Sequence, residues 1–184
     1  MSQISIRPAS IQDSDFIRSV SERTWPSTYG HIISQEQIDF MLDWMYSDAS
    51  LAEQFQKGCQ FFIANIMKEN HELKNGEFKN EEFKNEVFEE IGFCSVSPEN
   101  ANEHKLNKLY VLPKAQGTGA GKALLNKAIE VAKEAGSTSL FLQVNKLNTA
   151  YTFYLKHGFV KERDFKFDIG YGFFMDDYVM RLHL

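Results

Sequence analysis

The sequence predicts one α/β domain (α+β in some schemes) over residues 1–184, with a mixed central β-sheet and helices on both faces. The first observation is a strand–helix–strand unit over residues 105–144, which requires a crossover and therefore two parallel strands. The second is that shorter strand-like segments, suited to antiparallel hairpins, lie on both sides of this unit. The third is a composition with 43% hydrophobic and 24% charged residues, typical of a globular protein with a substantial core.

The N-terminal third is expected to contain one strand followed by three helices. Residues 4–8 alternate apolar and polar side chains, which predicts a short strand that ends near Pro8. A first helix precedes an aromatic turn expected at residues 25–30, and Ser34 forms a capping box with Gln37 at the start of the second. The first and third helices are expected to begin at Asp13 or Ser14 and at Asp48 or Ser50.

A low-complexity insertion occupies residues 68–90, between strands predicted at residues 61–66 and 91–96. Lys-Asn pairs and phenylalanines recur in it every five residues. A period of five keeps no side chain on one face of a helix or of a strand, so these phenylalanines form no stripe. We therefore expect an expanded, mobile hairpin loop, with a partner-binding segment as the alternative and no catalytic role.

The second half of the chain supplies the strand–helix–strand unit and a final hairpin. Pro113 ends the strand at residues 105–112, Gly136 ends the following helix, and Gly158 ends a short helix that begins at Thr149. A turn around Gly170-Tyr171-Gly172 joins the last two strands. The predicted elements of this half are a strand at 105–112, a helix at 122–135, a strand at 139–144, a helix at 149–157, and strands at 159–167 and 173–184.

A glycine-rich segment between the strand at 105–112 and the next helix predicts an anion site. Three glycines at alternate positions, Gly117, Gly119 and Gly121, allow close approach of the backbone to a ligand. The start of a helix presents unpaired amides and the positive end of its dipole, which favours phosphate. The dinucleotide fingerprint fails because Lys122 stands at its last glycine, and the P-loop fails because Gln116 stands at its first.

The pattern that fits is Gln-x-x-Gly-x-Gly at Gln116, Gly119 and Gly121, directly after an L-Y-V-x-P strand. This resembles the acetyl-CoA pyrophosphate loop of the GNAT-type N-acetyltransferases. The early aromatic turn and the Asp-Tyr-Val-Met ending at residues 177–180 are similar to the polyamine-acetylating branch of that family. The resemblance implies the GNAT-like acyl-CoA N-acyltransferase fold, in which acetyl-CoA lies between two splayed central strands and an amine attacks the thioester directly. It implies cofactor contacts for two segments, Leu109, Tyr110 and Val111 along the pantetheine arm and Gln116, Gly117, Thr118, Gly119, Ala120, Gly121 and Lys122 around the pyrophosphate.

A second motif lies about 30 residues after the first. Residues 148–159 are similar to the family's N-x-x-A-x-x-F-Y-x-x-x-G-F segment, which implies that Tyr154 protonates the leaving thiolate and that Asn148 contacts the cofactor. A phenol with a pKa of about 10 can return a proton to a thiolate with a pKa of about 8.5. Asn148 precedes Tyr154 by six residues, where the family usually has seven. The alternative for Tyr154 is simple packing on a helix face.

The general base is left open by the sequence. Many members of the family place a glutamate at the position of Lys105, and this chain has none there. An amine with a pKa of about 10.4 is almost entirely protonated at neutral pH, so a proton acceptor is needed. The candidates are Glu103, His104, and a water chain to Asp176 or Asp177.

The acceptor is expected to bind between the early helices and the final hairpin. Trp25, Tyr29 and Tyr171 would supply aromatic walls, and Asp176, with Asp177 and Glu22, could attract a cation. The resemblance implies acetyl-CoA as co-substrate, a small-molecule (polyamine-like) or peptide amine as acceptor, and frequently a homodimer. The alternatives are a CoA-binding regulatory module without turnover, supported by Lys105, and a nucleotide-binding protein.

Several other classes are disfavoured by charge and composition. A formal net charge of −5 argues against a nucleic-acid binder that tracks phosphates. There is no basic-then-apolar leader and no long apolar run, so no signal peptide or membrane segment is expected. Cys59 and Cys94 form no disulfide framework, which favours a reduced, cytoplasmic protein without a metal site.

Overall fold

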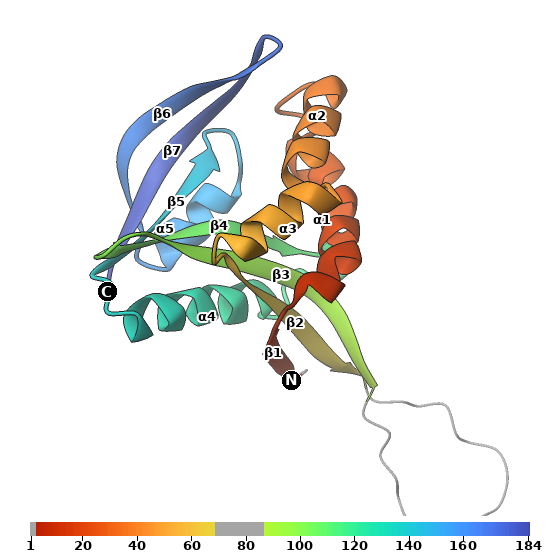
Figure 1. Cartoon of the computed structure of the whole chain (residues 1–184), viewed down its shortest axis with the longest axis vertical. Coiled ribbons are helices and arrows are strands. Elements are labelled where there is room, and N and C mark those ends of the chain that lie inside the picture. The colour runs from red at the N-terminus through yellow and green to blue at the C-terminus, as the bar shows by residue number, and fades with distance from the viewer. Residues whose placement is uncertain (1–2, 69–86) are drawn as a thin grey trace, which may run out of the picture.

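The computed structural model describes residues 3–68 and 87–184, which form a seven-stranded mixed sheet with helices on both faces (Figure 1). The sheet order is β1-β2-β3-β4-β5-β7-β6, with β4 and β5 parallel and every other pair antiparallel. This confirms the predicted fold class. The strands are β1 (Ile4–Pro8), β2 (Gln60–Lys68), β3 (Val87–Asn100), β4 (Glu103–Val111), β5 (Ser139–Asn145), β6 (Val160–Gly170) and β7 (Phe173–His183). The α-helices are α1 (Ser14–Tyr29), α2 (Gln35–Tyr46), α3 (Asp48–Gln56), α4 (Ala120–Glu134) and α5 (Ala150–Lys156).

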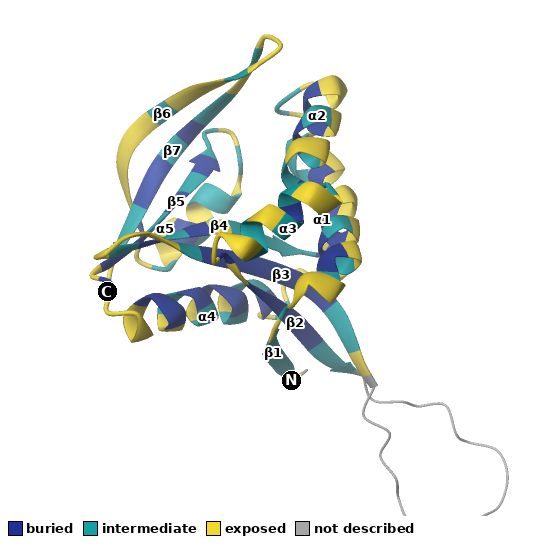
Figure 2. Cartoon of the chain, viewed as in Figure 1, coloured by how far each residue is buried: buried dark blue, intermediate teal, exposed yellow. Residues whose placement is uncertain are grey.

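Two hydrophobic cores lie on opposite faces of the sheet, because neighbouring side chains of a strand point in opposite directions. In β2, Phe61 and Ile63 belong to the core formed with α1, α2 and α3. Phe62 and Ala64 belong to the core formed with α4 and α5. Figure 2 shows the buried side of α4 turned toward the sheet and its exposed side turned away. Among the described helices, none is long and apolar enough to span a membrane.

The predicted aromatic turn at residues 25–30 is wrong, because α1 continues through Pro26 to Tyr29. A proline inside a helix costs about 3 kcal/mol, since it removes one hydrogen bond and crowds the preceding turn. Trp25 is only 2% exposed, and burying an aromatic side chain of this size contributes up to about 4–6 kcal/mol. The burial of Trp25 therefore outweighs the helix-breaking effect of Pro26.

The strands around the insertion are longer than predicted. β2 reaches Lys68 and β3 begins at Val87, so residues 87–90 are paired strand and lie outside any loop. The expectation of a mobile hairpin loop, and the alternative of a partner-binding segment, fall on residues 69–86, which lie outside the described residues. β3 also continues past Pro98. A proline has no N–H to donate to the neighbouring strand, and the register with β4 shifts directly after Pro98.

The parallel pair β4 and β5 separates after four residues. Glu103 to Leu106 pair with Ser139 to Leu142, and no pairing between the two strands follows in the described residues. Beyond this point β4 stays paired with β3 as far as Val111, while β5 stays paired with β7 as far as Asn145. The sheet therefore opens in a V between the second halves of β4 and β5. Asn107, the first residue of β4 after the separation, is skipped in the register with β3 and forms a β-bulge.

Candidate active site

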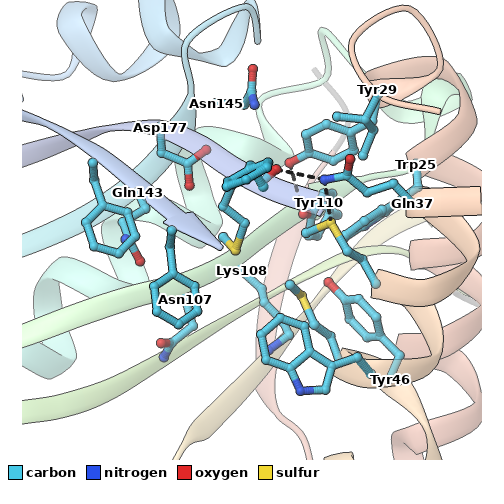
Figure 3. A pocket seen from close by; sticks show the side chains of 18 of the residues that line it. Trp25, Tyr29, Gln37, Tyr46, Asn107, Lys108, Tyr110, Gln143, Asn145 and Asp177 are labelled. Atoms are coloured by element: carbon cyan, nitrogen blue, oxygen red, sulfur yellow. Dashed lines mark hydrogen bonds between the residues drawn. The ribbon is translucent and has the colours of Figure 1, made fainter. Parts of the chain in front are cut away.

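Two cavities meet at the V between β4 and β5. The larger, about 750 Å³, is lined by the end of α1, β4, the glycine-rich segment, β5 and α5. The smaller, about 380 Å³, lies toward α1, α2 and the β6–β7 hairpin (Figure 3). Tyr29, Tyr110 and Gln143 line both cavities, as do residues 106–108 of β4. The larger cavity thus passes through the opening of the sheet, with α5 on one face and α1 on the other, and meets the smaller cavity there.

The glycine-rich segment has the geometry of an anion site. Gly117 and Gly119 have φ angles of +83° and +94°, and a Cβ added to either would meet nothing within 4 Å. Gly119 caps α4, whose first described hydrogen bond runs from the amide of Ala123 to the carbonyl of Gly119 at 3.0 Å. The amides of residues 120–122 therefore have no acceptor within the helix. With the positive end of the α4 dipole, they can bind a pyrophosphate, so the residues present fit the phosphates of CoA.

Most of the predicted cofactor contacts are brought together around the larger cavity. Thr118 and Ala120 do not line it. The Thr118 hydroxyl donates to the carbonyl of Ala115 at 2.7 Å, and the Ala120 methyl group is buried in the core. Any contact of these two with a ligand would be through the backbone. The predicted residues that line the cavity are Leu109, Tyr110, Val111, Gln116, Gly117, Gly119, Gly121, Lys122 and Asn148.

Asn148 has a structural task in addition to its place in the cavity wall. Its side-chain oxygen accepts a hydrogen bond from the amide of Ala150 at 2.9 Å, which closes a turn at the start of α5. The amide of Tyr151 bonds to the carbonyl of Asn148 at 3.1 Å in the same turn. Asn148 thereby fixes the entry of the helix that carries Tyr154.

Tyr154 lines the larger cavity from α5 and is 8% exposed. Its ring contacts Phe153 and Phe159, and among the described residues its hydroxyl has no hydrogen-bond partner. Burial raises the pKa of Tyr154, so the phenol keeps its proton at neutral pH. The position and the protonation state both suit a proton donor.

Aromatic side chains form the helix side of the smaller cavity, as expected for Trp25 and Tyr29. Their rings lie 4.8 Å apart, and the hydroxyls of Tyr29 and Tyr110 are 3.3 Å apart. The Gln37 side chain donates to the carbonyl of Phe174 at 2.8 Å, which ties α2 to β7 (Figure 3). The contacts hold the helices and the hairpin on either side of the space.

Tyr171 and Glu22 lie away from the smaller cavity. Tyr171 is 85% exposed at the tip of the β6–β7 hairpin, where its ring contacts that of Phe40 at 5.3 Å. Glu22 borders a separate depression on the outer side of α1 and α2. Neither position supports the predicted contact with the acceptor.

Of the two neighbouring aspartates on β7, only Asp177 lines the smaller cavity. Asp176 points to the other face of the strand, where its Oδ1 lies 2.7 Å from the ammonium of Lys146. Asp177 is 5% exposed, and burial together with the charge of Asp176 raises its pKa to about 6. The geometry therefore gives no support to Asp176 as an acceptor contact and places Asp177 there instead.

Glu103 and His104 lie at the paired end of β4, away from both cavities. Glu103 accepts hydrogen bonds from Arg181 and from Ser139, the latter at 3.1 Å. His104 is buried, and its Nδ1 lies 2.7 Å from the Ser137 hydroxyl. The side chains of Glu103 and His104 are thus held by hydrogen bonds within the protein, and neither is placed to take a proton from an acceptor.

Several lining residues of the smaller cavity were not predicted from the sequence. The sequence draws attention to Lys105 only through the glutamate that it replaces, and no motif in the sequence includes Lys108. Lysines on a strand usually extend into solvent, so the sequence carries no local signal for their place in a cavity. The cavity also contains the polar side chains Gln37, Asn107, Gln143 and Asn145.

An open V in a mixed sheet, with a phosphate-type loop on one side and an acceptor-sized cavity on the other, is the architecture of an acetyl-CoA-dependent acyltransferase. Residues 82–161 match the family model described as an acetyltransferase (GNAT) domain. Residues 82–161 are thus similar to a GNAT acetyltransferase domain, and the resemblance inferred from the two sequence motifs is confirmed.

Relatives over nearly the full length agree with this assignment. The chain is 28% identical over 169 residues to an uncharacterized N-acetyltransferase of Mycobacterium tuberculosis, covering 91% of this chain and 96% of the relative. It is 29% identical to a spermidine N(1)-acetyltransferase of Thermoplasma acidophilum, covering 86% and 89%. The crystal structure of a PaiA N-acetyltransferase from Thermoplasma acidophilum, in complex with coenzyme A, matches with a TM-score of 0.73 and 26% identity over 99% of each chain.

Proposed function

We propose that this protein transfers the acetyl group of acetyl-CoA to a primary amine of a small molecule or peptide, with both reactants bound at once. The observation that carries the proposal is the V between β4 and β5, where the phosphate-type cavity and the acceptor cavity share Tyr29, Tyr110 and Gln143. Holding two reactants in adjacent sites replaces an encounter in solution by a reaction within one complex. The coenzyme A in the related PaiA structure supports acetyl-CoA as the co-substrate.

Two side chains are proposed to handle protons. When bound, acetyl-CoA supplies a thioester whose acetyl carbon the amine attacks, with coenzyme A as the leaving thiol. Asp177, buried in the acceptor cavity with a pKa of about 6, is ionised at neutral pH and can accept a proton from the incoming ammonium, directly or through water. Tyr154, on the cofactor side, keeps its proton and can donate it to the thiolate.

Backbone amides are proposed to hold the cofactor. The amides of residues 120–122 would hold the phosphates, and the segment of Leu109, Tyr110 and Val111, which lies where β4 has left β5, would contact the pantetheine arm. Preorganised N–H donors can also stabilise the charge that develops on the thioester oxygen. Asn148 borders the same cavity and is proposed to act by shaping the start of α5.

Thiol release from acetyl-CoA against a panel of amines tests this function. Spermidine belongs in the panel because a relative is named for it, with amino acids and a peptide with a free N-terminus beside it. Tyr154→Phe is expected to lower the rate at least tenfold without weakening acetyl-CoA binding. Tyr151→Phe is the matched control, since Tyr151 lies on the same helix but outside both cavities.

The outcomes separate the candidate functions. Release that Tyr154→Phe leaves unchanged would retain the enzyme and refute the proton donor. Stabilisation by acetyl-CoA with no release would identify a CoA-binding module, for which Lys105 in place of a glutamate was the sequence argument. Displacement of acetyl-CoA by ATP at least as well as by CoA would indicate a nucleotide site. Neither release nor stabilisation would refute the proposal.

A further inference from the structure

The acceptor cavity carries more positive than negative charge. Its described lining contains two lysines, Lys105 and Lys108, and one carboxylate, that of Asp177. A polyamine entering this space would bring further positive charge to two ammonium groups, and like charges in a confined site disfavour binding. The charge balance therefore favours an acceptor that is itself partly anionic.

A β-bulge places both lysines on the acceptor side of β4. Residues three apart in a regular strand point to opposite faces. Because Asn107 is skipped in the register with β3, Lys105 and Lys108 both line the acceptor cavity. The side chains of Leu106 and Leu109 pack in the core on the α4 face. The bulge thus gathers two cations at the point where β4 separates from β5.

Lys108 has no acidic partner among the described residues. Its ammonium donates to the side-chain oxygen of Gln54 and lies 5.4 Å and 5.8 Å from the ring centres of Tyr46 and Phe61. Burial lowers its pKa to about 8, so the group is still mostly charged at neutral pH. An ammonium has three donors, and those not used by Gln54 remain for an anion.

Lys105 is in a different position, because it already interacts with negative charge. Its ammonium donates to the side-chain oxygen of Gln143 at 2.7 Å and is attracted by Glu99 and by Asp177. The negative charge of Asp177 therefore balances the positive charge of Lys105, whereas the positive charge of Lys108 has no acidic partner among the described residues. In Figure 3, Lys108 lies on the side of Tyr46, and Asp177 lies on the side of Gln143.

We propose that Lys108 binds the carboxylate of the acceptor, and that the acceptor is an α-amino acid with a large apolar or aromatic side chain. This rests on the proposed acetyltransferase function and names its substrate class. The remaining walls are aromatic and methionine side chains, which suit an apolar group. Among those walls are Trp25, Met41, Trp44, Met45, Tyr46, Phe165, Phe174 and Met175.

The test compares L-phenylalanine, L-phenylalaninamide and spermidine as acceptors, by kcat/KM for thiol release and by calorimetric titration of each into the CoA-bound protein. The amide differs from the acid by the lost carboxylate, and its less basic amine is more often neutral. A preference for the acid therefore reports recognition of the anion. Lys108→Gln is expected to raise KM for L-phenylalanine about tenfold to a hundredfold, as expected for a lost charge-assisted hydrogen bond, and to leave the amide within about twofold.

Lys161→Gln is the matched control, since the Lys161 ammonium also lies over a ring, that of Tyr178 at 4.1 Å, but outside both cavities. A tenfold preference for the acid that disappears in Lys108→Gln alone would establish the site. The proposed carboxylate site would be overturned if spermidine or the amide were the better acceptor. It would also be overturned if Lys108→Gln lowered kcat/KM equally for all three acceptors. If no amine is acetylated, the proposed function fails. The calorimetric titration still tests the carboxylate site: tighter binding of L-phenylalanine than of its amide would support the site, and equal or weaker binding would refute it.

Discussion

Replacing Asp177 by asparagine is expected to stabilise the protein at neutral and alkaline pH while lowering acetyl transfer. Asp177 is 5% exposed in the acceptor cavity, and burial together with Asp176 raises its pKa from the usual 3.8 to about 6. Between these two values the folded state holds a proton that the unfolded state releases. The contribution of Asp177 to stability is therefore fully present below pH 4 and is lost as the pH rises through 6.

The size of the effect follows from the two pKa values. They differ by about two, and each pKa unit corresponds to about 1.4 kcal/mol, so the ionised carboxylate costs the fold up to about 3 kcal/mol. Asparagine has a similar shape and never ionises. For a domain of this size the gain corresponds to a rise of roughly 6–12 °C in Tm at pH 8, and to almost none at pH 4.

The assay is thermal and urea unfolding of the wild type and Asp177→Asn from pH 4 to pH 8. Asp164→Asn is the matched control, because the Asp164 carboxylate is exposed, is paired with Lys146 and is not a cause of the raised pKa of Asp177. Loss of such a surface pair is expected to change the unfolding free energy by less than about 1 kcal/mol. An equal effect of Asp177→Asn at pH 4 and pH 8, or destabilisation at pH 8, would refute the electrostatic reasoning.

Three further predictions concern the same site. Tyr154→Phe should leave Tm within a few degrees, because the hydroxyl lies at the larger cavity and has no hydrogen-bond partner among the described residues; a large drop in Tm would make its effect on kcat a packing effect. Gly92→Ala should cost about 1–3 kcal/mol in urea unfolding and weaken acetyl-CoA binding, since the new Cβ would lie 2.5 Å from the carbonyl oxygen of Tyr110; unchanged stability would contradict that close approach. The wild-type kcat/KM should rise as the pH passes through about 6, and a rise that persists in Asp177→Asn would exclude Asp177 as the proton acceptor.

Features that depend on short stretches of chain were predictable from the sequence. Glycines at residues 117 and 119 adopt positive φ angles beside the start of α4, because these are local properties of glycine and of helix starts, although α4 begins at Ala120, two residues before the predicted start. Tyr154, singled out by its spacing behind the loop, lines the same cavity as the loop. Such patterns can be recognised without the tertiary structure because the residues that define them are close together in the sequence.

Features that depend on the register between strands distant in the sequence could not be predicted from the sequence. Asp176 and Asp177 are adjacent in the sequence, yet the pairing of β7 turns one toward Lys146 and the other into the cavity. The skipped residue Asn107 is a property of the pairing between β3 and β4, and it alone brings Lys105 and Lys108 to the same face.

The sequence by itself determined the class of fold and the glycine-rich segment before α4, and it singled out Tyr154, since each is encoded in the spacing of a few residues. The tertiary structure decided which carboxylate enters the acceptor cavity, and that two lysines face it there. The physical reason is the two-residue period of a strand: a shift of one residue in pairing exchanges its two faces, and only the assembled sheet sets that shift.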